Sequence, residues 1–261
     1  MTMSQAYIPS VAGCEAARAL SDEMRRDFAV VVPAFNEAPV VPDLVRELRA
    51  TFEALGLSGE VIFVDDGSTD GTAELARREA GGWEGFKVVS HRRNLGKTEA
   101  MLTGAALTQR TFLVLFDADL QHRPDEIPRF LAKLQEGWDV VTGRKVGSYE
   151  KRGVSSVYNR LSRQIFRVPV SDLNSMKAFR AEILEGMFLR HDWHRFFVVL
   201  AHARGYRVTE IDVELLPRRE SRPVNPLKHL VVLIAAPISA RDRQQLKCRN
   251  IFCIVDVIPL A

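Results

Sequence analysis

The sequence predicts an α/β protein with a mainly parallel β-sheet and helices on both of its faces. Short apolar segments alternate along the chain with amphipathic helical segments, as they do in repeated βαβ units. The apolar segments lack polar alternation, which is typical of strands buried on both faces. Two acidic pairs, Asp65–Asp66 and Asp117–Asp119, come directly after such segments. Parallel sheets bind ligands beyond the carboxyl ends of their strands, so the same pattern predicts a site there.

The elements follow one another in a regular order from residue 28 onwards. The expected strands are 28–35, 60–66, 86–91, 111–117, 139–144 and 206–215, and the expected helices are 39–55, 69–78, 96–107, 124–135, 151–167, 178–190 and 193–204. The helix at 39–55 has its apolar residues on one face, namely Val41, Leu44, Val45, Leu48, Phe52 and Leu55. The segment STDGTAEL offers several residues that can cap the helix at 69–78.

The chain of 261 residues is long enough for one large domain or two small ones. No linker divides it, so we expect a single domain over residues 28–222. Residues 1–27 are mixed and polar and are expected to form a mobile arm that could contain one helix. Residues 223–261 form a divergent tail whose role the sequence does not indicate.

Composition and charge exclude several functional classes. The net charge of +3 is too small to indicate nucleic acid as a partner. Three cysteines without CxxC spacing favour neither a disulfide framework nor a zinc site, and they fit a reducing cytoplasm. No signal peptide is recognisable near the N-terminus, and the uncharged run Leu230–Ala240 has 11 residues, about half of a membrane span. We therefore expect no transmembrane segment.

The segment FDADLQ places three oxygen-bearing side chains, Asp117, Asp119 and Gln121, at alternate positions after a buried strand. On a turning backbone such ligands can converge on one hard cation, Mg²⁺ or Mn²⁺, which they share with phosphate oxygens. The alternative is that one aspartate caps a helix and the other is a solvated loop residue. The second acidic pair, Asp65–Asp66, favours a binding site, although these carboxylates could also serve as caps.

Two other motifs fail on their spacing. The segment NLGKT (94–98) lacks the glycine that a P-loop needs, because His91 stands in its place. The segment DGSTDG begins like a calcium loop, but the twelfth position is Arg77 rather than an acid. No GxGxxG follows a strand, so dinucleotide binding is not indicated either.

Five motifs stand in order along the chain: PAFNE (33–37), VDDGSTDGT (64–72), NLGK (94–97), DADLQHRP (117–124) and TGR (142–144). Together they resemble the family 2 glycosyltransferases, in particular the branch of dolichol-phosphate mannose synthase and bacterial polyprenyl-phosphate sugar transferases. The similarity extends through 172–184 and 192–219. It implies a GT-A (Rossmann-like) fold and an inverting enzyme. Such an enzyme moves a sugar from a GDP- or UDP-linked nucleotide-diphosphate sugar to a polyprenyl (dolichyl-type) phosphate, with a divalent metal.

The resemblance also implies roles for the motif residues. The nucleotide-sugar pocket would comprise Pro33, Phe35, Glu37, Val64, Asp66, Lys97, Ala118, Arg144 and Arg218, and the metal ligands would be Asp117, Asp119 and Gln121. Phe35 replaces the tyrosine of many relatives, which keeps base stacking but loses a hydroxyl contact. Arg144 would pair with phosphate, as a bidentate guanidinium suits. Asp119 and Asp172 would be catalytic, and Asp172 would either orient the acceptor or the metal site or cap a helix.

Several alternatives stay open on the sequence alone. His194, Arg195, Arg218 and Arg219 could contact phosphate or be ordinary surface cations. The basic amphipathic helix at 151–167 could lie on the inner face of a membrane, as in a peripheral protein, or pack on the sheet. The enzyme could use a soluble acceptor in place of the lipid, or the chain could bind a nucleotide sugar without turnover.

Overall fold

A computed structural model describes residues 7–217, except for 147–167, 174, 188, 190–193 and 195. The helices are α1 (Val11–Ala19), α2 (Val41–Leu55), α3 (Thr72–Glu79), α4 (Lys97–Ala106), α5 (Ile127–Gln135) and α7 (Phe197–Ala203), with 3₁₀ turns η1 (Pro124–Glu126) and η2 (Ala181–Leu184). The strands are β1 (Phe28–Ala34), β2 (Glu60–Asp65), β3 (Phe86–Ser90), β4 (Phe112–Leu115), β5 (Val140–Val146), β6 (Lys177–Arg180) and β7 (Val208–Glu214).

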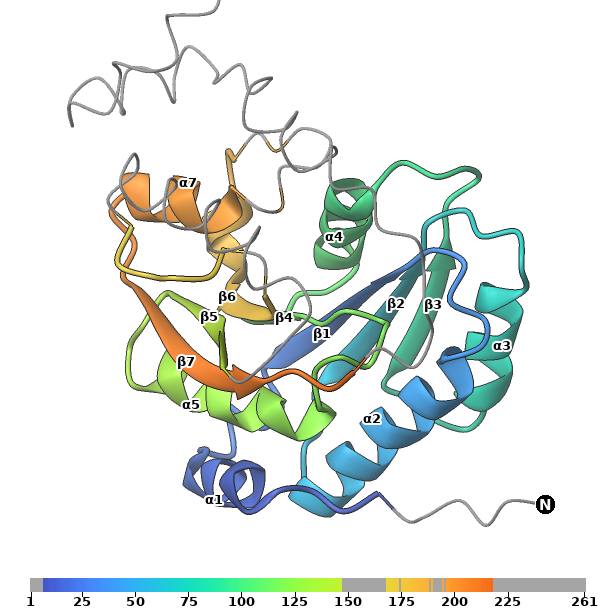
Figure 1. Ribbon diagram of the computed structural model, residues 1–261, viewed down its shortest axis with the longest axis horizontal. Coiled ribbons are helices and arrows are strands. Elements are labelled where there is room, and N and C mark those ends of the chain that lie inside the picture. The colour runs from blue at the N-terminus through green and yellow to red at the C-terminus, as the bar shows by residue number, and fades with distance from the viewer. Residues whose placement is uncertain are drawn as a thin grey trace, which may run out of the picture.

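The described strands form one sheet in the order β3-β2-β1-β4-β6-β5-β7 (Figure 1). β1 pairs in parallel with β2 and β4, β2 with β3, and β5 with β7. β6 runs antiparallel to both β4 and β5. The helix expected over 178–190 is therefore wrong, because strand β6 and the turn η2 occupy its first half. Pairing between two neighbouring strands outweighs the local helical preference of these residues.

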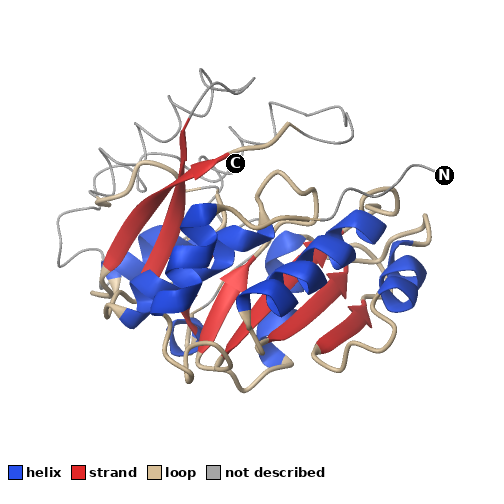
Figure 2. Ribbon diagram, turned by 90° about the horizontal axis from the view of Figure 1, so that it is seen from below, coloured by secondary structure: helices blue, strands red, loops and turns tan. Residues whose placement is uncertain are grey.

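Helices cover both faces of the sheet. α1, α2, α3 and α5 pack on one face, and α4 and α7 pack on the other (Figure 1). Each face of the sheet has its own hydrophobic core: the first core lies under α1, α2, α3 and α5, and the second lies under α4 and α7. In β1, Val30 and Val32 belong to the first core, and Ala29 and Val31 belong to the second. Figure 2 shows the strands fanning across the sheet with helices lying along them. The absence of polar alternation in the sequence of β1 is thus explained by burial on both faces.

α2 illustrates how the sequence sets the bounds of a helix. Its buried residues recur at every third or fourth position, so that one stripe faces the core. Pro42 stands in the first turn, where its missing N–H costs no hydrogen bond. Gly56 follows the last residue with a φ of +62°, the left-handed conformation in which many helices end.

The described part of the N-terminal segment, residues 7–24, packs on the domain, whereas the sequence predicts a mobile arm over residues 1–27. Ala17, Leu20 and Met24 are buried in the first core. Gln135 of α5 donates a hydrogen bond from Nε2 to the Ala19 carbonyl at 3.0 Å. Buried apolar side chains and hydrogen bonds to α5 together dock this segment on the domain.

Some expected features lie outside the described residues. These are the basic helix at 151–167, the cations Arg195, Arg218 and Arg219, and the tail at 223–261. None of the helices that the structure describes has the length and apolarity needed to cross a membrane.

Candidate active site

A cleft of about 280 Å³ opens beyond the carboxyl ends of β1 and β4, next to the N-terminus of α4. Its lining residues are Pro33, Ala34, Phe35, Glu37, Asp66, Asn94, Gly96, Lys97, Asp117, Ala118 and Asp119. All of these except Ala34, Asn94 and Gly96 are site residues that the sequence predicts. They meet because parallel strands end at the same edge of a sheet.

The loop after β1 forms one wall of the cleft. Phe35 is 38% exposed, so part of its ring faces solvent there. Asn36 has a φ of +53°, which non-glycine residues adopt infrequently. Its backbone N donates to Ser68 Oγ at 2.8 Å, and its Oδ1 accepts from Thr69 N at 2.9 Å. The segment after β2 therefore holds this loop, and with it Phe35, in place.

Most acidic residues of the VDDGSTDGT motif act within the framework. Asp65 Oδ1 accepts a hydrogen bond from Ser68 N at 3.2 Å. Asp70 accepts from Ala38 N at 3.1 Å and from Thr72 N at 3.1 Å. The motif thus joins the loops after β1 and β2 into one unit. Asp65 and Asp70 serve this structural role, which explains their presence without a contact to a ligand.

Asp66 organises the loop at 91–96. Its carboxylate accepts hydrogen bonds from Leu95 N and Gly96 N, both at 2.8 Å, and contacts His91 Nδ1 at 2.8 Å. The residue is only 3% exposed, although it lines the cleft. The sequence places Asp66 in the nucleotide-sugar pocket, and in the structure both of its oxygens are engaged in shaping the wall.

Gly67 lets the loop at 91–96 approach closely. Its φ is +73°, and a Cβ at this position would lie 2.4 Å from the carbonyl carbon of Arg93. Both the backbone conformation and the contact therefore require glycine.

The loop after β4 carries the acidic pair Asp117 and Asp119. Asp117 forms an ion pair with Lys97, the first residue of α4, and the two side chains are 33% and 31% exposed. Burial opposes ionisation of Asp117, yet Lys97 outweighs it and, with His122 and Lys177, holds the pKa of the carboxyl well below its ordinary value. Asp117 is therefore an anion at neutral pH.

The turn that follows is strained. Asp119 Oδ1 accepts a hydrogen bond from Gln121 N at 3.2 Å. Between them, Leu120 is buried at 1% exposure with a φ of +52°. Within the described part of the chain, Asn36 and Leu120 are the only non-glycine residues with positive φ, and both lie in loops of the cleft. Strain of this kind concentrates at functional sites.

The residues present fit a Mg²⁺ or Mn²⁺ ion whose shell is completed by diphosphate oxygens. Asp117 and Asp119 line the cleft, and Gln121 stands on the same turn. Among the residues that the structure describes, no three His, Cys, Asp or Glu side chains gather into a complete metal site. The two carboxylates in the cleft suit Mg²⁺, which usually takes one or two carboxylates together with substrate phosphates and water.

A second group of polar side chains, which we call the basic cluster, consists of Lys145, Lys177 and His122 together with Asp172. Lys177 and His122 are 2% and 4% exposed, and both interact electrostatically with Asp117. Lys177 Nζ donates to the Ser175 carbonyl at 2.7 Å. Lys145 Nζ lies 3.7 Å from Asp172 Oδ2. Asp172 is thus paired with a lysine near the acidic loop and does not line the cleft.

The electrostatics of the basic cluster follow from burial. Burial lowers the pKa of Lys177 to about 7; Lys97 acts in the same direction, and Asp117 and Asp172 oppose it. Burial also lowers the pKa of His122 to about 4, so its imidazole is neutral at physiological pH. Its Nδ1 atom is buried without a hydrogen-bond partner among the described residues.

Arg144 does not reach the cleft. It is exposed, and its Nη2 bonds to Asp212 Oδ2 on β7 at 2.9 Å. A strand sends successive side chains to opposite faces, so the neighbouring Lys145 turns toward Asp172 instead. The predicted contact between Arg144 and the diphosphate is not supported by this placement.

Two further predicted site residues, Val64 and Arg218, are not among the described residues that line the cleft. Val64 is fully buried in the second core, and Arg218 lies outside the described residues. Sequence reasoning missed Lys145 and Lys177, which approach the site only through the pairing of β4, β6 and β5. For Lys177, the sequence offered one signal: this lysine stands between the apolar residues Met176 and Ala178.

Comparisons with known proteins agree with this geometry. Residues 29–205 match the family model for glycosyl transferase family 2. The undecaprenyl-phosphate 4-deoxy-4-formamido-L-arabinose transferases of Salmonella paratyphi A and Salmonella dublin are each 33% identical over 193 residues. The match covers 72% of this chain and 59% of each relative. The chain therefore spans about three fifths of the length of the curated relatives that it matches.

Solved structures of glucosyl-3-phosphoglycerate synthase from Mycobacterium tuberculosis share the fold. The complex with Mn²⁺, UDP and glucosyl-3-phosphoglycerate is 22% identical with a TM-score of 0.66, covering 92% of this chain and 83% of that one. The complex with Mg²⁺ and UDP is 22% identical with a TM-score of 0.65, at 92% and 83% coverage. The chain thus has a GT-A fold. By its matching domain and the order of its motifs, it belongs to glycosyl transferase family 2.

Proposed function

We propose that this chain transfers a sugar from a nucleotide-diphosphate sugar to a polyprenyl phosphate, with inversion and with Mg²⁺ or Mn²⁺. The observation that carries the proposal is that Phe35, Lys97, Asp117 and Asp119 share one cleft. A ring, a cation and two carboxylates suit a base, a diphosphate and a divalent metal, respectively. The names of the curated relatives support a polyprenyl phosphate as the acceptor.

The donor would lie along the cleft from Phe35 to Asp119. The ring of Phe35 would stack on the base, between Pro33 and Glu37. Lys97 would donate to the diphosphate, and its place in the first turn of α4 adds the favourable end of the helix dipole. Asp117, Asp119 and Gln121 would hold the metal, which neutralises charge on the leaving diphosphate when bound.

The acceptor needs little activation. A phosphate monoester is already anionic at neutral pH, so its oxygen can attack the anomeric carbon without a general base. The bond from that carbon to the donor diphosphate breaks as the new carbon–oxygen bond forms, and the nucleoside diphosphate leaves with the electron pair. Attack from the face opposite the leaving group inverts the anomeric configuration.

We assign the acceptor phosphate to the basic cluster, where Lys145 and the protonated form of Lys177, whose pKa is about 7, would supply positive charge. Lys177 on β6 interacts electrostatically with Asp117, and Lys145 on β5 interacts with His122; neither lysine lines the cleft that Phe35 helps to form. Asp172 pairs with Lys145 at 3.7 Å, so we assign it to positioning that lysine rather than to removing a proton. A lipid acceptor also means that the enzyme works at a membrane surface.

Turnover with labelled donors tests this function. UDP- and GDP-sugars would be supplied with Mn²⁺ and one of three acceptors: undecaprenyl phosphate in vesicles, the soluble 3-phosphoglycerate, or none. We expect label to enter the lipid fraction only, and only with one class of donor. Label in the soluble acceptor would overturn the lipid assignment. Donor binding without transfer to either acceptor would overturn the enzymatic proposal.

A further inference from the structure

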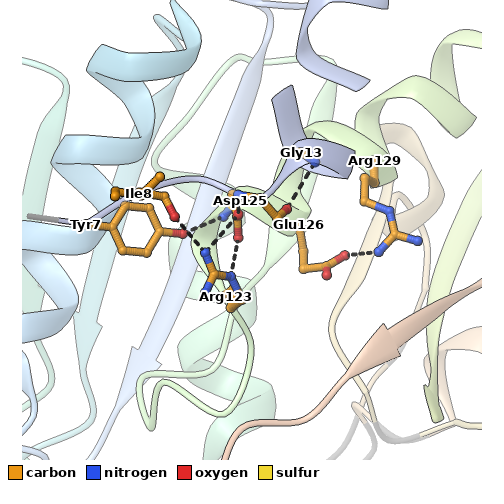
Figure 3. A network of polar contacts seen from close by, with 8 residues as sticks. Tyr7, Ile8, Gly13, Arg123, Asp125, Glu126 and Arg129 are labelled. Carbon is orange, nitrogen blue, oxygen red and sulfur yellow. Dashed lines mark hydrogen bonds and ion pairs between the residues drawn. The ribbon is translucent and has the colours of Figure 1, made fainter. Parts of the chain in front are cut away.

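The N-terminal segment, residues 7–24, contacts Arg123 and Asp125, which follow the turn that carries the proposed metal ligands. This segment precedes the region that matches the family model, which begins at residue 29. α1 lies beside α5 in Figure 1, and Figure 3 shows Tyr7, Ile8 and Gly13 gathered around Arg123 and Asp125. Arg123 is only two residues beyond Gln121, so the contact lies next to the acidic turn.

Asp125 is the centre of this contact. It is fully buried at 0% exposure. Arg123 donates to both of its oxygens, from Nε at 3.0 Å and from Nη2 at 3.1 Å. Ser10 N donates to the same carboxylate. A buried carboxylate is tolerated only with such partners, so the loop and the N-terminal segment depend on one another.

Arg123 binds the N-terminal segment as well. Its Nη2 donates to the Ile8 carbonyl at 2.9 Å, and its guanidinium lies 5.4 Å from the centroid of the Tyr7 ring. Asp125 N donates to Tyr7 Oη at 3.2 Å. Close packing completes the contact, because a Cβ on Gly13 would lie 2.5 Å from the Asp125 carbonyl oxygen (Figure 3).

The acidic turn needs support at both ends. Leu120 holds a left-handed conformation that persists only where the surroundings determine it. Pairing of β4 with β1 and β6 fixes the chain before the turn. After the turn, Arg123 and Asp125 are fixed by the N-terminal segment, and Leu216 N donates to the Gln121 carbonyl at 2.9 Å.

We propose that Tyr7, Arg123 and Asp125 are positioning residues for the metal site: through them, the N-terminal segment holds the turn at 117–121 in its ion-binding shape. The proposal rests on the proposed metal site. None of the three residues lines the cleft, so they act through the turn rather than on the donor or the ion.

Mn²⁺ affinity, measured by titration with detection of unbound Mn²⁺ by electron paramagnetic resonance, tests the proposal without reference to activity. Tyr7→Ala removes the ring over Arg123 and the acceptor for Asp125 N. We expect about tenfold weaker Mn²⁺ binding, the lower end of what loss of an outer-shell partner costs. Tyr7→Phe keeps the ring and should fall between this variant and the wild type.

Gln135→Ala is the matched control. It removes the hydrogen bonds to Ala19 and Ser21, which tie the same segment to α5 at its other end. We expect lower thermal stability with unchanged Mn²⁺ affinity. Equal loss of affinity in Gln135→Ala and Tyr7→Ala would show a general effect of stability and overturn the proposal.

Other outcomes separate this inference from the proposed function. Wild-type protein that binds no Mn²⁺ would overturn the metal site itself. Wild-type binding that Tyr7→Ala leaves unchanged would overturn only the positioning role. If Tyr7→Ala does not fold, as judged by circular dichroism, Tyr7→Phe decides, and an affinity equal to that of the wild type counts against the proposal.

Discussion

Asp66 and Asp117 both follow buried strands, yet the structure gives them different tasks. Asp66 is engaged by two backbone N–H groups and a histidine, so its carboxylate is fixed in the wall of the cleft. The Asp117 carboxylate forms an ion pair with the Lys97 side chain and is about a third exposed, so it is open to an ion from the cleft. The sequence predicts the place of both residues, but their tasks depend on how the loop at 91–96 returns to the sheet.

His122 gives a prediction at the residue scale. Its pKa is about 4 in the folded protein, because burial outweighs the attraction of Asp117, whereas an unfolded histidine titrates near pH ~6.5. The unfolded state binds more protons between these values, so the free energy of unfolding falls as the pH is lowered through this window. The contribution of His122 to this fall in the free energy of unfolding is at most about 1.4 kcal/mol per pH unit.

The control is His122→Gln, which keeps a polar side chain but cannot titrate. Urea unfolding of both proteins, at neutral pH and at several lower values, should show a smaller pH dependence for the variant. Parallel pH dependence in the two proteins would show that His122 is not held neutral by the fold.

At the scale of elements, the sequence predicts what local patterns determine. The ends of β1, β2 and β4 are recognisable because each is an apolar run followed at once by polar motif residues. β6 is not recognisable, because its four residues have no strand pattern of their own and pair only with strands distant in the sequence. The placement of Arg144 outside the cleft lining has a related reason: which face of β5 meets the site depends on that pairing.

Gly67 and Gly82 give a prediction at this scale. Their φ values are nearly equal, +73° and +74°, but only Gly67 faces the backbone of another loop, while a Cβ on Gly82 would meet nothing within 4 Å. Gly82→Ala should therefore lower the free energy of unfolding by on the order of 1 kcal/mol, which is the cost of placing a residue with a Cβ in the left-handed conformation. Gly67→Ala should cost more, since the loop at 91–96 must move.

Chemical denaturation and donor binding measure the two consequences separately. We expect Gly67→Ala to weaken nucleotide-sugar binding, because Asn94, Gly96 and Lys97 line the cleft. Gly82→Ala should leave binding unchanged. Equal effects of the two substitutions would mean that the contact of Gly67 with Arg93 does not shape the site.

At the scale of the whole molecule, the two parts of the sheet supply different chemistry. The parallel strands β1, β2 and β4 end in the acidic and aromatic residues of the cleft. The antiparallel pair β6 and β5 carries Lys177, which interacts electrostatically with Asp117, and Lys145, which interacts with His122. This division is what the proposed reaction requires, in which one anionic substrate would be held with a metal and the other by lysines.

The most direct test of this account is calorimetric titration of UDP and GDP into the wild type, Asp119→Asn and Asp43→Asn, with and without Mn²⁺. Asp43 is a partly exposed partner of Arg46 on α2 and serves as a control for the loss of one carboxylate. We predict Mn²⁺-dependent binding of one nucleotide to the wild type and to Asp43→Asn. For Asp119→Asn, we predict that the affinity for this nucleotide in the presence of Mn²⁺ falls by about tenfold or more. Undiminished Mn²⁺-dependent binding to Asp119→Asn would contradict the account.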